Sequence, residues 1–449
     1  MKKGTGKTGR NGRERRPGLW VVSLVIGFQV AGLILFSIAT PVPVEAKTFT
    51  VNSTLDEEDA DTADGICSST PSDVCTLRAA IQQANALVGA DTIKLKAGLY
   101  ILTIAGASEN ACASGDLDIT DDLTITGTGA KNTFINGGQL DRVFHVIDPL
   151  LDGISVTITD MTIENGVATD DGYGDMNYVI GGGILNESGS STLTLKGITL
   201  SHNTASGGVD GRGGGIYNSG TLRITKSLLS NSTLFDNAAS GGSSAVAGGA
   251  IYNNAGTLTI KATTIFNNIV SGPNNGYGGG ISNYAFLETR QSTISNNTVS
   301  VQGEFGSGGG IFNNGSLTVM HSTISNNTTQ GVNGNGGGID NGGEVTITTS
   351  IISGNIARGP FARGGGIASF FGSVVITGST LSYNAASGTW GGGGGIYLGD
   401  NPLTVRNESK IVRNFASDVG GGICYGGVGT GSVSADSIVA KNIPDDIYP

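Results

Sequence analysis

The sequence predicts an all-β fold, a single-stranded right-handed parallel β-helix solenoid of about 12 coils with a short N-terminal capping helix. The first observation is a Gly-Gly-Gly-Ile motif, with one Gly-Gly-Ala-Ile copy, that recurs at intervals of 27 to 35 residues. The second is that each repeat holds three short apolar pieces separated by Gly, Asn and Ser, which favours short strands over helices. The third is a pair of asparagine columns at fixed places in the repeats.

The repeat isoleucines are expected to stack inward, because one coil cannot bury its own apolar face but coils about 4.8 Å apart bury it for one another. These isoleucines are Ile184, Ile216, Ile251, Ile281, Ile311, Ile339, Ile367, Ile396 and Ile423. The glycines before them suit a tight corner with positive φ. Ser307, just before one such motif, is expected in a loop between repeats.

The two asparagine columns predict side-chain ladders, because asparagine tolerates left-handed corners and its amide can bond to the amide of the next coil. The first column is Asn186, Asn218, Asn253, Asn283, Asn313 and Asn341. The second is Asn203, Asn237, Asn268, Asn297, Asn327, Asn355, Asn384, Asn414 and Asn442. Sugar or ion binding is the alternative role, but stacking already explains a residue that keeps one phase in nearly every coil.

Residues 1–46 predict a signal peptide or an N-terminal membrane anchor, because seven basic residues precede an apolar run and then small residues before Lys47. The chain has 25 basic and 36 acidic residues, of which the leader holds 7 and 2. The remainder therefore has 18 basic and 34 acidic residues, a net charge of −16. Such a charge argues against nucleic acid as a partner. Contact with a membrane is expected only through the N-terminal segment.

Residues 47–115 predict a cap. The stretch from Thr76 to Asn85 reads as a helix with Leu77, Ala80, Ile81 and Ala84 on one face and Thr76 as N-cap. Such a helix would cover the open end of the solenoid, residues 116–449.

Cys75-Thr76-Leu77-Arg78-Ala79-Ala80 resembles the Cys-Ser-Leu-Arg-Glu-Ala signature of the CSLREA domain, although Ala79 removes the family's carboxylate. The repeats are similar to those of choice-of-anchor Q proteins, and less closely to polymorphic outer membrane proteins, whose Phe-x-x-Asn motif is mostly missing. The resemblance implies a pectin-lyase-like β-helix of a bacterial surface protein.

Two further features of the cap region suggest sites. Cys67 and Cys75 flank one polar loop of an exported chain, which favours a disulfide, whereas Cys424 reads as a buried core residue and the role of Cys112 stays open. Asp59, Asp61 and Asp64 alternate in an acidic run and are the candidate metal ligands, with calcium as the one candidate cofactor. A solvated acidic loop is the alternative, because the bidentate Glu of an EF-hand is missing.

No catalytic residues are assigned. His202 and His321 are expected on the surface, and the acid pairs Asp121-Asp122, Asp170-Asp171 and Asp445-Asp446 lie far apart along the solenoid. The sequence therefore favours a monomeric protein, secreted or on the bacterial cell surface, with a structural, adhesive or glycan-binding role and a surface glycan or protein as ligand. The alternative is a polysaccharide lyase or glycoside hydrolase of the same fold.

Overall fold

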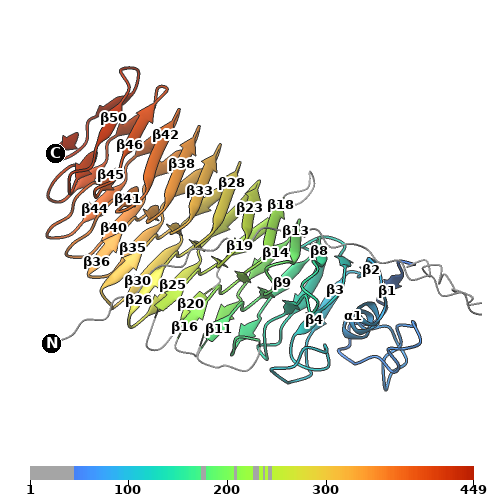
Figure 1. Ribbon diagram of the computed structural model, residues 1–449. Helices are drawn as coiled ribbons and strands as arrows, with labels where there is room; N and C mark the ends of the chain where they lie inside the picture. Colours follow the sequence, from blue (N-terminus) through green and yellow to red (C-terminus); the bar gives the residue numbers. More distant parts are fainter. Residues whose placement is uncertain (1–44, 173–177, 207–209, 226–231, 236–237, 241–244) are drawn as a thin grey trace, which may run out of the picture. The chain divides into compact units, whose positions relative to one another are not determined.

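The computed structural model describes residues 45–172, 178–206, 210–225, 232–235, 238–240 and 245–449. These residues form a mostly-β parallel β-solenoid of about eleven turns with a single helix (Figure 1), which confirms the predicted parallel β-helix. The predicted leader lies outside the described residues except for its last two positions. Within the described ranges, no helix is long and apolar enough to cross a membrane.

Five parallel sheets run along the solenoid. The long sheet has 13 strands, from β1 (Thr48–Thr50) and β2 (Asp91–Lys94) to β50 (Gly431–Val433). The corner sheet has 12 strands, from β3 (Gly98–Ile101) to β51 (Ile438–Ala440), and the side sheet has nine, from β10 (Val167–Ala168) to β48 (Phe415–Ala416).

The other two sheets, here called the groove sheet and the facing sheet, build the site described below. The groove sheet consists of β4 (Leu117–Ile119), β7 (Phe144–Val146), β12 (Ile184–Asn186), β17 (Ile216–Asn218), β22 (Ile251–Asn253), β27 (Ile281–Asn283), β32 (Ile311–Asn313), β37 (Ile339–Asn341), β41 (Ile367–Ser369), β45 (Ile396–Leu398), β49 (Ile423–Tyr425) and β52 (Ile447–Tyr448). The facing sheet consists of β11 (Tyr178–Ile180), β16 (Asp210–Arg212), β21 (Ala245–Ala247), β26 (Asn275–Tyr277), β31 (Phe305–Ser307) and β36 (Asn333–Asn335).

The predicted isoleucine column is confirmed. Each repeat isoleucine opens a strand of the groove sheet and pairs in register with the next, as Ile281 does with Ile311. All nine are fully buried in one continuous core. The first glycine of the motif has positive φ, 64° at Gly308, and a Cβ on Gly309 would lie 2.5 Å from the carbonyl oxygen of Gly337 in the next coil. Glycine is therefore required at this corner by backbone conformation and by close approach.

Both asparagine columns form hydrogen-bonded rows wherever the structure describes them. In the first, each side-chain Nδ2 donates to Oδ1 of the next asparagine, from Asn186 to Asn341, and Asn341 donates to Oγ of Ser369. In the second, the same bond links each asparagine to the next from Asn268 to Asn442, and Asn442 donates to Oδ1 of Asp446. Oδ1 of Asn203 accepts from the N–H of Gly166 in the coil before, and Asn237 lies outside the described residues.

The left-handed corner lies one residue earlier than expected. Where the structure describes the second column, the positive φ belongs to the residue before each asparagine, for example Asn326 at 56° and Tyr383 at 56°. This expectation was wrong because the ladder asparagines must point inward to reach the next coil, so the preceding exposed residue makes the bend. That residue varies in type along the chain, and the fixed asparagine column does not mark it.

A row of serines between the long and corner sheets went unrecognised in the sequence. The N–H of Ser322 donates to Oγ of Ser350, and the same bond links each member to the next. The row comprises Ser292, Ser322, Ser350, Ser379, Ser409 and Ser437. Serine is common throughout these repeats, and the row could have been found only by aligning the coils on their isoleucines.

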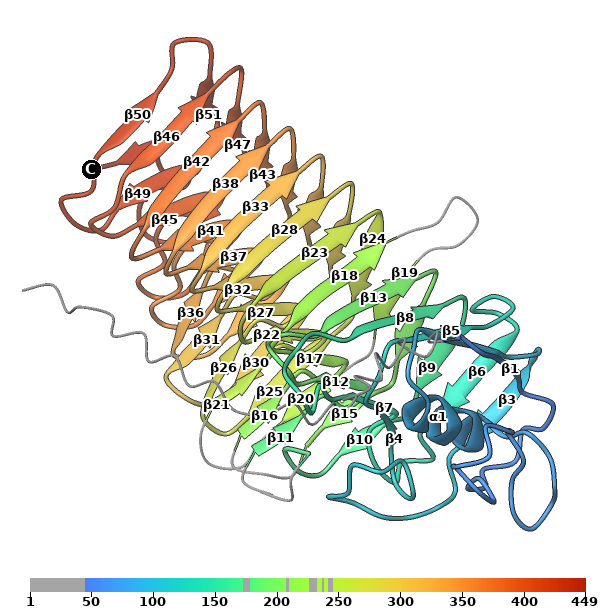
Figure 2. The same cartoon turned by 45° about the vertical axis from the view of Figure 1, so that its right-hand side comes forward.

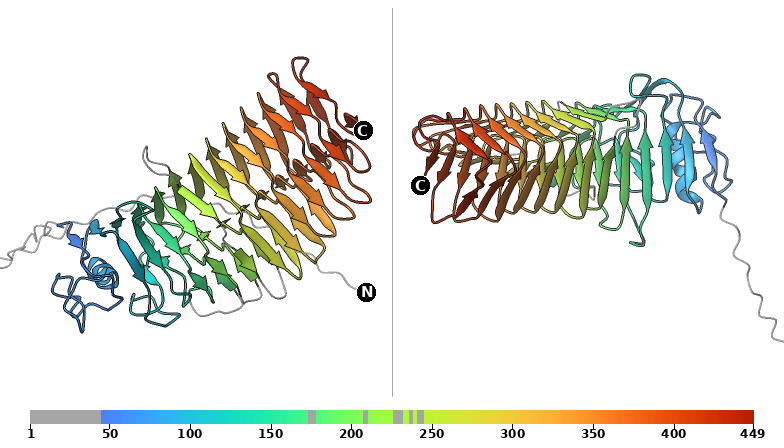
Figure 3. Two further views of the ribbon diagram at one scale, coloured as in Figure 1. Left: turned by 180° about the vertical axis from the view of Figure 1, so that it is seen from behind. Right: turned by 90° about the horizontal axis from the view of Figure 1, so that it is seen from above.

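The cap region supplies three strands and the helix. β1, β2 and β3 are hydrogen-bonded members of the long and corner sheets. Helix α1 (Leu77–Ala86) has Thr76 as N-cap, whose side chain accepts from the N–H of Ala79, and it lies against the first coils (Figures 2 and 3). Cys67 and Cys75 form a disulfide beside it.

Helix α1 is buried on more than its apolar face. Arg78 is fully buried, with Nε 2.7 Å from Oδ1 of Asp56. The Arg78 guanidinium also donates to the main-chain oxygens of Cys112, Gly115 and Asp116. This arginine thus ties the helix to the loop that precedes β4.

Candidate binding groove

The outer face of the groove sheet is covered unevenly along the solenoid. The middle residue of each strand points away from the isoleucine core, and from β12 to β22 it packs against the facing sheet, as Tyr217 and Tyr252 do with Ile180 and Ala247. The facing sheet ends at β36. Single bridges continue its line through Arg363, Gly392 and Val419, so the two faces still meet at a corner along the later coils.

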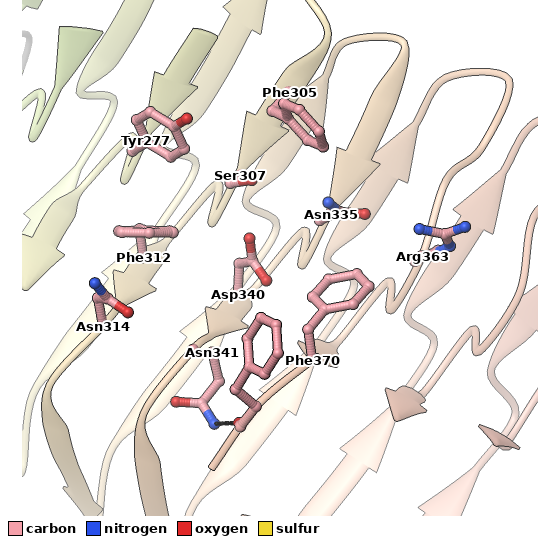
Figure 4. A pocket seen from close by; sticks show the side chains of 12 residues that line it. Tyr277, Phe305, Ser307, Phe312, Asn314, Asn335, Asp340, Asn341, Arg363 and Phe370 are labelled. Carbon is pink, nitrogen blue, oxygen red and sulfur yellow. Dashed lines mark hydrogen bonds between the residues drawn. The ribbon is translucent and has the colours of Figure 1, made fainter. Parts of the chain in front are cut away.

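A pocket of about 430 Å³ lies at this corner. It is lined by aromatic rings, amides, one carboxyl and one guanidinium: Tyr277, Phe305, Ser307, Phe312, Asn314, Asn335, Asp340, Asn341, Gly342, Arg363, Phe370 and Phe371. Figure 4 shows Asp340 between Phe312 and Tyr277 on one side and Phe370 and Arg363 on the other. The lining residues come from several successive coils, so the pocket extends along the solenoid axis.

Aromatic rings on neighbouring coils contact one another on both sides of the pocket. On the N-terminal side, Tyr277 lies 4.9 Å from Phe312 between ring centroids, and Tyr284 lies 5.7 Å from Phe312 and 5.4 Å from Tyr252. On the C-terminal side, Phe370 and Tyr397 are 5.5 Å apart. Such contacts fix ring orientation, and each contributes about 0.5–1.5 kcal/mol beyond area burial.

A guanidinium lies over the rings of the C-terminal side. The Arg363 guanidinium lies 5.7 Å from the Phe370 ring and 5.2 Å from the Tyr397 ring. Cation–π contacts of this kind hold an arginine in place without a carboxylate partner. Arg363 therefore presents fixed N–H donors at the pocket rim.

Asp340 is the buried polar residue at the centre of the pocket. It is the middle residue of β37 and is 6% exposed. Burial raises the pKa of Asp340 to about 7, and hydrogen bonds with the Ser307 hydroxyl and the Asn341 N–H offset only part of this rise. Ser307, expected in a loop, instead lies in β31 and is buried. That expectation was wrong because the facing sheet continues to the residue before the glycine motif.

The candidate calcium ligands lie around Nε2 of Gln83, which donates to Oδ2 of Asp59, to the main-chain oxygen of Asp61 and to Oδ1 of Asp64. Oδ1 of Asp61 accepts from the N–H of Ala63, and Oδ1 of Asp64 accepts from the N–H of Ile66, as in Asx turns. Asp59 accepts from the N–H of Ser68 and from Nε2 of Gln83. In this arrangement the three carboxylates shape their own loop, and their metal role stays a prediction.

The described residues that do gather potential metal ligands are Asp116, Asp118 and His145. They belong to the charge cluster, defined as Asp116, Asp118, Asp141, Arg142, His145, Asp170 and Glu187. Arg142 lies 3.0 Å from Asp116 and 2.6 Å from Asp170, and all three side chains are almost completely buried. The cluster was not predicted, because its members occur once each in irregular coils. The sequence signal that could have revealed it is the presence of acids and a histidine inside apolar strand pieces.

The electrostatics of the charge cluster favour a buried cation at His145. Burial lowers the pKa of His145, but contacts with Asp118 and Glu187 raise it, and the net value is about 9. Burial raises the pKa of Asp116 to about 7, although Arg142 acts in the opposite direction. Arg142 also lowers the pKa of Asp170, against the effect of burial.

The remaining residues singled out in the sequence are dispersed. His202 and His321 are exposed, and Cys112 and Cys424 are buried free cysteines. Of the acid pairs, only Asp170 belongs to the charge cluster. No family model, curated protein or solved structure matches this chain. The likeness to CSLREA and choice-of-anchor Q proteins therefore rests on the quoted residues.

Proposed function

We propose that this chain is an exported surface protein whose pocket binds a neutral glycan along the solenoid axis. The observation that carries the proposal is the concave row of aromatic rings from successive coils, with amide and hydroxyl groups between them. Binding sites of this kind are mostly apolar and use a few fixed polar groups for orientation. A sugar ring offers the matching chemistry, with C–H faces for the rings and hydroxyls for the amides.

The pocket presents exposed aromatic surface as well as buried rings. Phe371 is 72% exposed and Phe305 is 36% exposed. Exposed apolar patches rimmed by polar groups mark interaction sites. Asn314 and Arg363 lie on that rim as donors, whereas Asn335 is buried in the lining.

The charge of the chain favours an uncharged ligand. With the leader removed, 18 basic residues face 34 acidic ones, a net charge of −16. A polyanionic glycan would be repelled by this field. Within the lining, Asp340 and Arg363 contribute one acidic and one basic group, so the pocket itself gives no strong charge preference.

Binding is favoured over cleavage by the carboxyl groups at hand. Among the described residues that line the pocket, Asp340 carries the one carboxyl group. Glycoside hydrolysis generally uses two carboxyl groups about 5–9.5 Å apart. Asp116, Asp118 and Asp170 are too deeply buried to reach a polysaccharide chain.

Export and surface location belong to the same proposal. The basic and apolar leader, the Cys67–Cys75 disulfide and the resemblance of Cys75–Ala80 to the CSLREA signature support an exported bacterial chain. The asparagine rows make the solenoid a rigid scaffold on which the pocket is preformed.

The test is a binding screen of the full chain against neutral and anionic polysaccharides, with reducing-end release measured in parallel. We expect binding to a neutral glycan without release of new ends. Phe371→Ala is expected to weaken binding at least tenfold, whereas Phe286→Ala, an exposed aromatic in the long sheet, leaves it unchanged. Failure to bind any neutral glycan, or equal effects of both substitutions, would overturn the proposal; release of new ends would favour the hydrolase or lyase alternative.

A further inference from the structure

The charge cluster lies in the coils just before the first asparagine row begins. That row begins at Asn186, and the two preceding coils of the groove sheet carry Val146 and Ile119 at the same register. Asp118 and His145 are the middle residues of those same strands and pair with each other in register. The first coils therefore need another device to fix their outer face.

Three side chains of the cluster have the arrangement of metal ligands. One ligand atom from each of Asp116, Asp118 and His145 lies within 4.8 Å of the other two. Oδ1 of Asp118 and Nδ1 of His145 are 3.3 Å apart. Two ligands of a tetrahedral ion are about 3.3–3.5 Å apart when each bond is about 2.0–2.1 Å long. The measured separation thus fits an ion between them.

The facing atoms of that pair are otherwise unsatisfied. Both side chains are fully buried, and apart from their mutual contact neither Oδ1 of Asp118 nor Nδ1 of His145 has a hydrogen-bond partner. Buried polar atoms are normally hydrogen-bonded, and an exception in a native fold calls for an ion or a functional explanation. A bound ion would satisfy both atoms at once.

The outer contacts are those that metal ligands normally have. Nε2 of His145 lies 3.0 Å from Oε2 of Glu187, so the ring nitrogen that would not bind the metal faces a carboxylate. The other oxygen of Asp118 accepts from the N–H of Cys112 at 2.8 Å. Carboxylate partners of a metal-bound histidine fix its tautomer and orientation.

The charges also call for a cation. Five carboxyl groups, those of Asp116, Asp118, Asp141, Asp170 and Glu187, share the cluster with the Arg142 guanidinium and the His145 ring, so the carboxyl groups outnumber the basic groups. Buried charges that lack partners are strongly destabilising. A divalent ion would reduce this excess where the two aspartates meet the histidine.

We propose that Asp116, Asp118 and His145 hold one structural Zn²⁺ ion with a buried water as its fourth ligand, and that Glu187 is the outer carboxylate of the histidine. Two carboxylates and an imidazole suit zinc, whereas calcium takes six to eight oxygen ligands. The site is closed to solvent, so the ion is acquired during folding. Through Cys112 and Asp118 it fixes the loop that covers the first coils.

The test is the metal content of the full-length chain, produced in zinc-supplemented medium and then dialysed against metal-free buffer. We expect one zinc per chain. Refolding with Co²⁺ alone is expected to give the visible spectrum of a tetrahedral site. A chain that retains only substoichiometric zinc and shows no tetrahedral Co²⁺ spectrum would overturn the proposal, and His145 would then be an imidazolium held by two carboxylates.

Variants locate the ion. Asp118→Asn is expected to remove it, and metal that persists in this variant would also overturn the proposal. Because Asp118→Asn is buried and can impair folding, Glu187→Gln provides a second readout at a partly exposed residue. It should lower zinc affinity about 10–100-fold. Asp418→Asn, at an exposed aspartate outside the cluster, is the control and should keep one zinc per chain.

Discussion

Asn327 donates its main-chain N–H and its side-chain Nδ2 to one atom, Oδ1 of Asn355, at 3.0 and 2.9 Å. The same pair of hydrogen bonds joins Asn297 to Asn327 and Asn384 to Asn414. Each asparagine therefore satisfies a buried N–H of the coil before it and depends on the coil after it. The row acts as a continuous link between successive coils.

Asn327→Leu is expected to destabilise its own part of the solenoid. Leucine cannot accept from Asn297, so a buried N–H and a buried amide lose their partner, at about 1–3 kcal/mol for each unsatisfied group. Because coils couple mainly to their neighbours, the damage should stay local. Limited proteolysis followed by mass spectrometry should show new cleavage near residues 295–330 and none near α1.

The matched control is Asn254→Leu, at an exposed asparagine next to a ladder residue. Its effect should lie within about ±0.5 kcal/mol. If both variants resist protease and unfold like the wild type, the asparagine row is not structural and needs a binding explanation.

The Arg78–Asp56 pair should be strongly coupled. Arg78→Met leaves a buried carboxylate and three main-chain oxygens without their donor, a loss of about 3–5 kcal/mol for a broken buried pair. Asp56→Asn leaves the guanidinium without its carboxylate. In urea unfolding, the double variant should lose less than the sum of the single losses. Additive losses would show that the pair does not hold the helix to the first coils.

Asp340 should make stability fall as pH rises. Its pKa of about 7 in the folded chain exceeds the value near 3.8 expected when unfolded, so the folded state favours the neutral form. The contribution of this carboxyl to the free energy of unfolding is highest below about pH 4. It falls by up to ~4 kcal/mol between about pH 4 and 7 and stays low at higher pH.

Asp340→Asn should remove that decline. The stability of the variant relative to the wild type is therefore expected to be higher at pH 8 than at pH 4.5. Thermal unfolding at the two pH values measures the difference. Asp418→Asn, at an exposed aspartate, is the control. A wild-type difference unchanged by Asp340→Asn would contradict the assignment.

Loss of the disulfide should weaken the cap and leave the later coils intact. Cys67 and Cys75 are eight residues apart in sequence. Closing a loop of this size stabilises a fold by roughly 2–3 kcal/mol in the chain-entropy model. Cys67→Ala with Cys75→Ala should speed hydrogen exchange in residues 52–86, with exchange beyond residue 180 unchanged. If residues 52–86 exchange as slowly in the variant as in the wild type, the bridge does not stabilise the cap.

The repeated features were predictable because many coils report the same constraint. Ile311 and Asn327 each have counterparts in nearly every coil, so sequence spacing alone placed them in buried columns. The predicted helix and its N-cap Thr76 followed from local rules of the same kind.

The sites were harder to predict because they depend on single positions. Asp118 and His145 meet because β4 and β7 pair in register, which no periodic signal in these irregular coils reveals. Asp340 replaces an aromatic or small residue at one middle position of the groove sheet, and its burial depends on the facing sheet. The corner bends at Asn326 and Tyr383 share a conformation but no residue type.

The most direct test of glycan binding in the pocket is a hydrogen-exchange footprint of the chain with its best neutral glycan from the screen. Slower exchange is predicted in peptides covering residues 305–315, 335–342 and 361–371, with no change in β28 (Phe286–Arg290) of the long sheet. Phe371→Ala should abolish that footprint at the same glycan concentration. Protection confined to the long sheet, or an unchanged footprint in Phe371→Ala, would contradict the account.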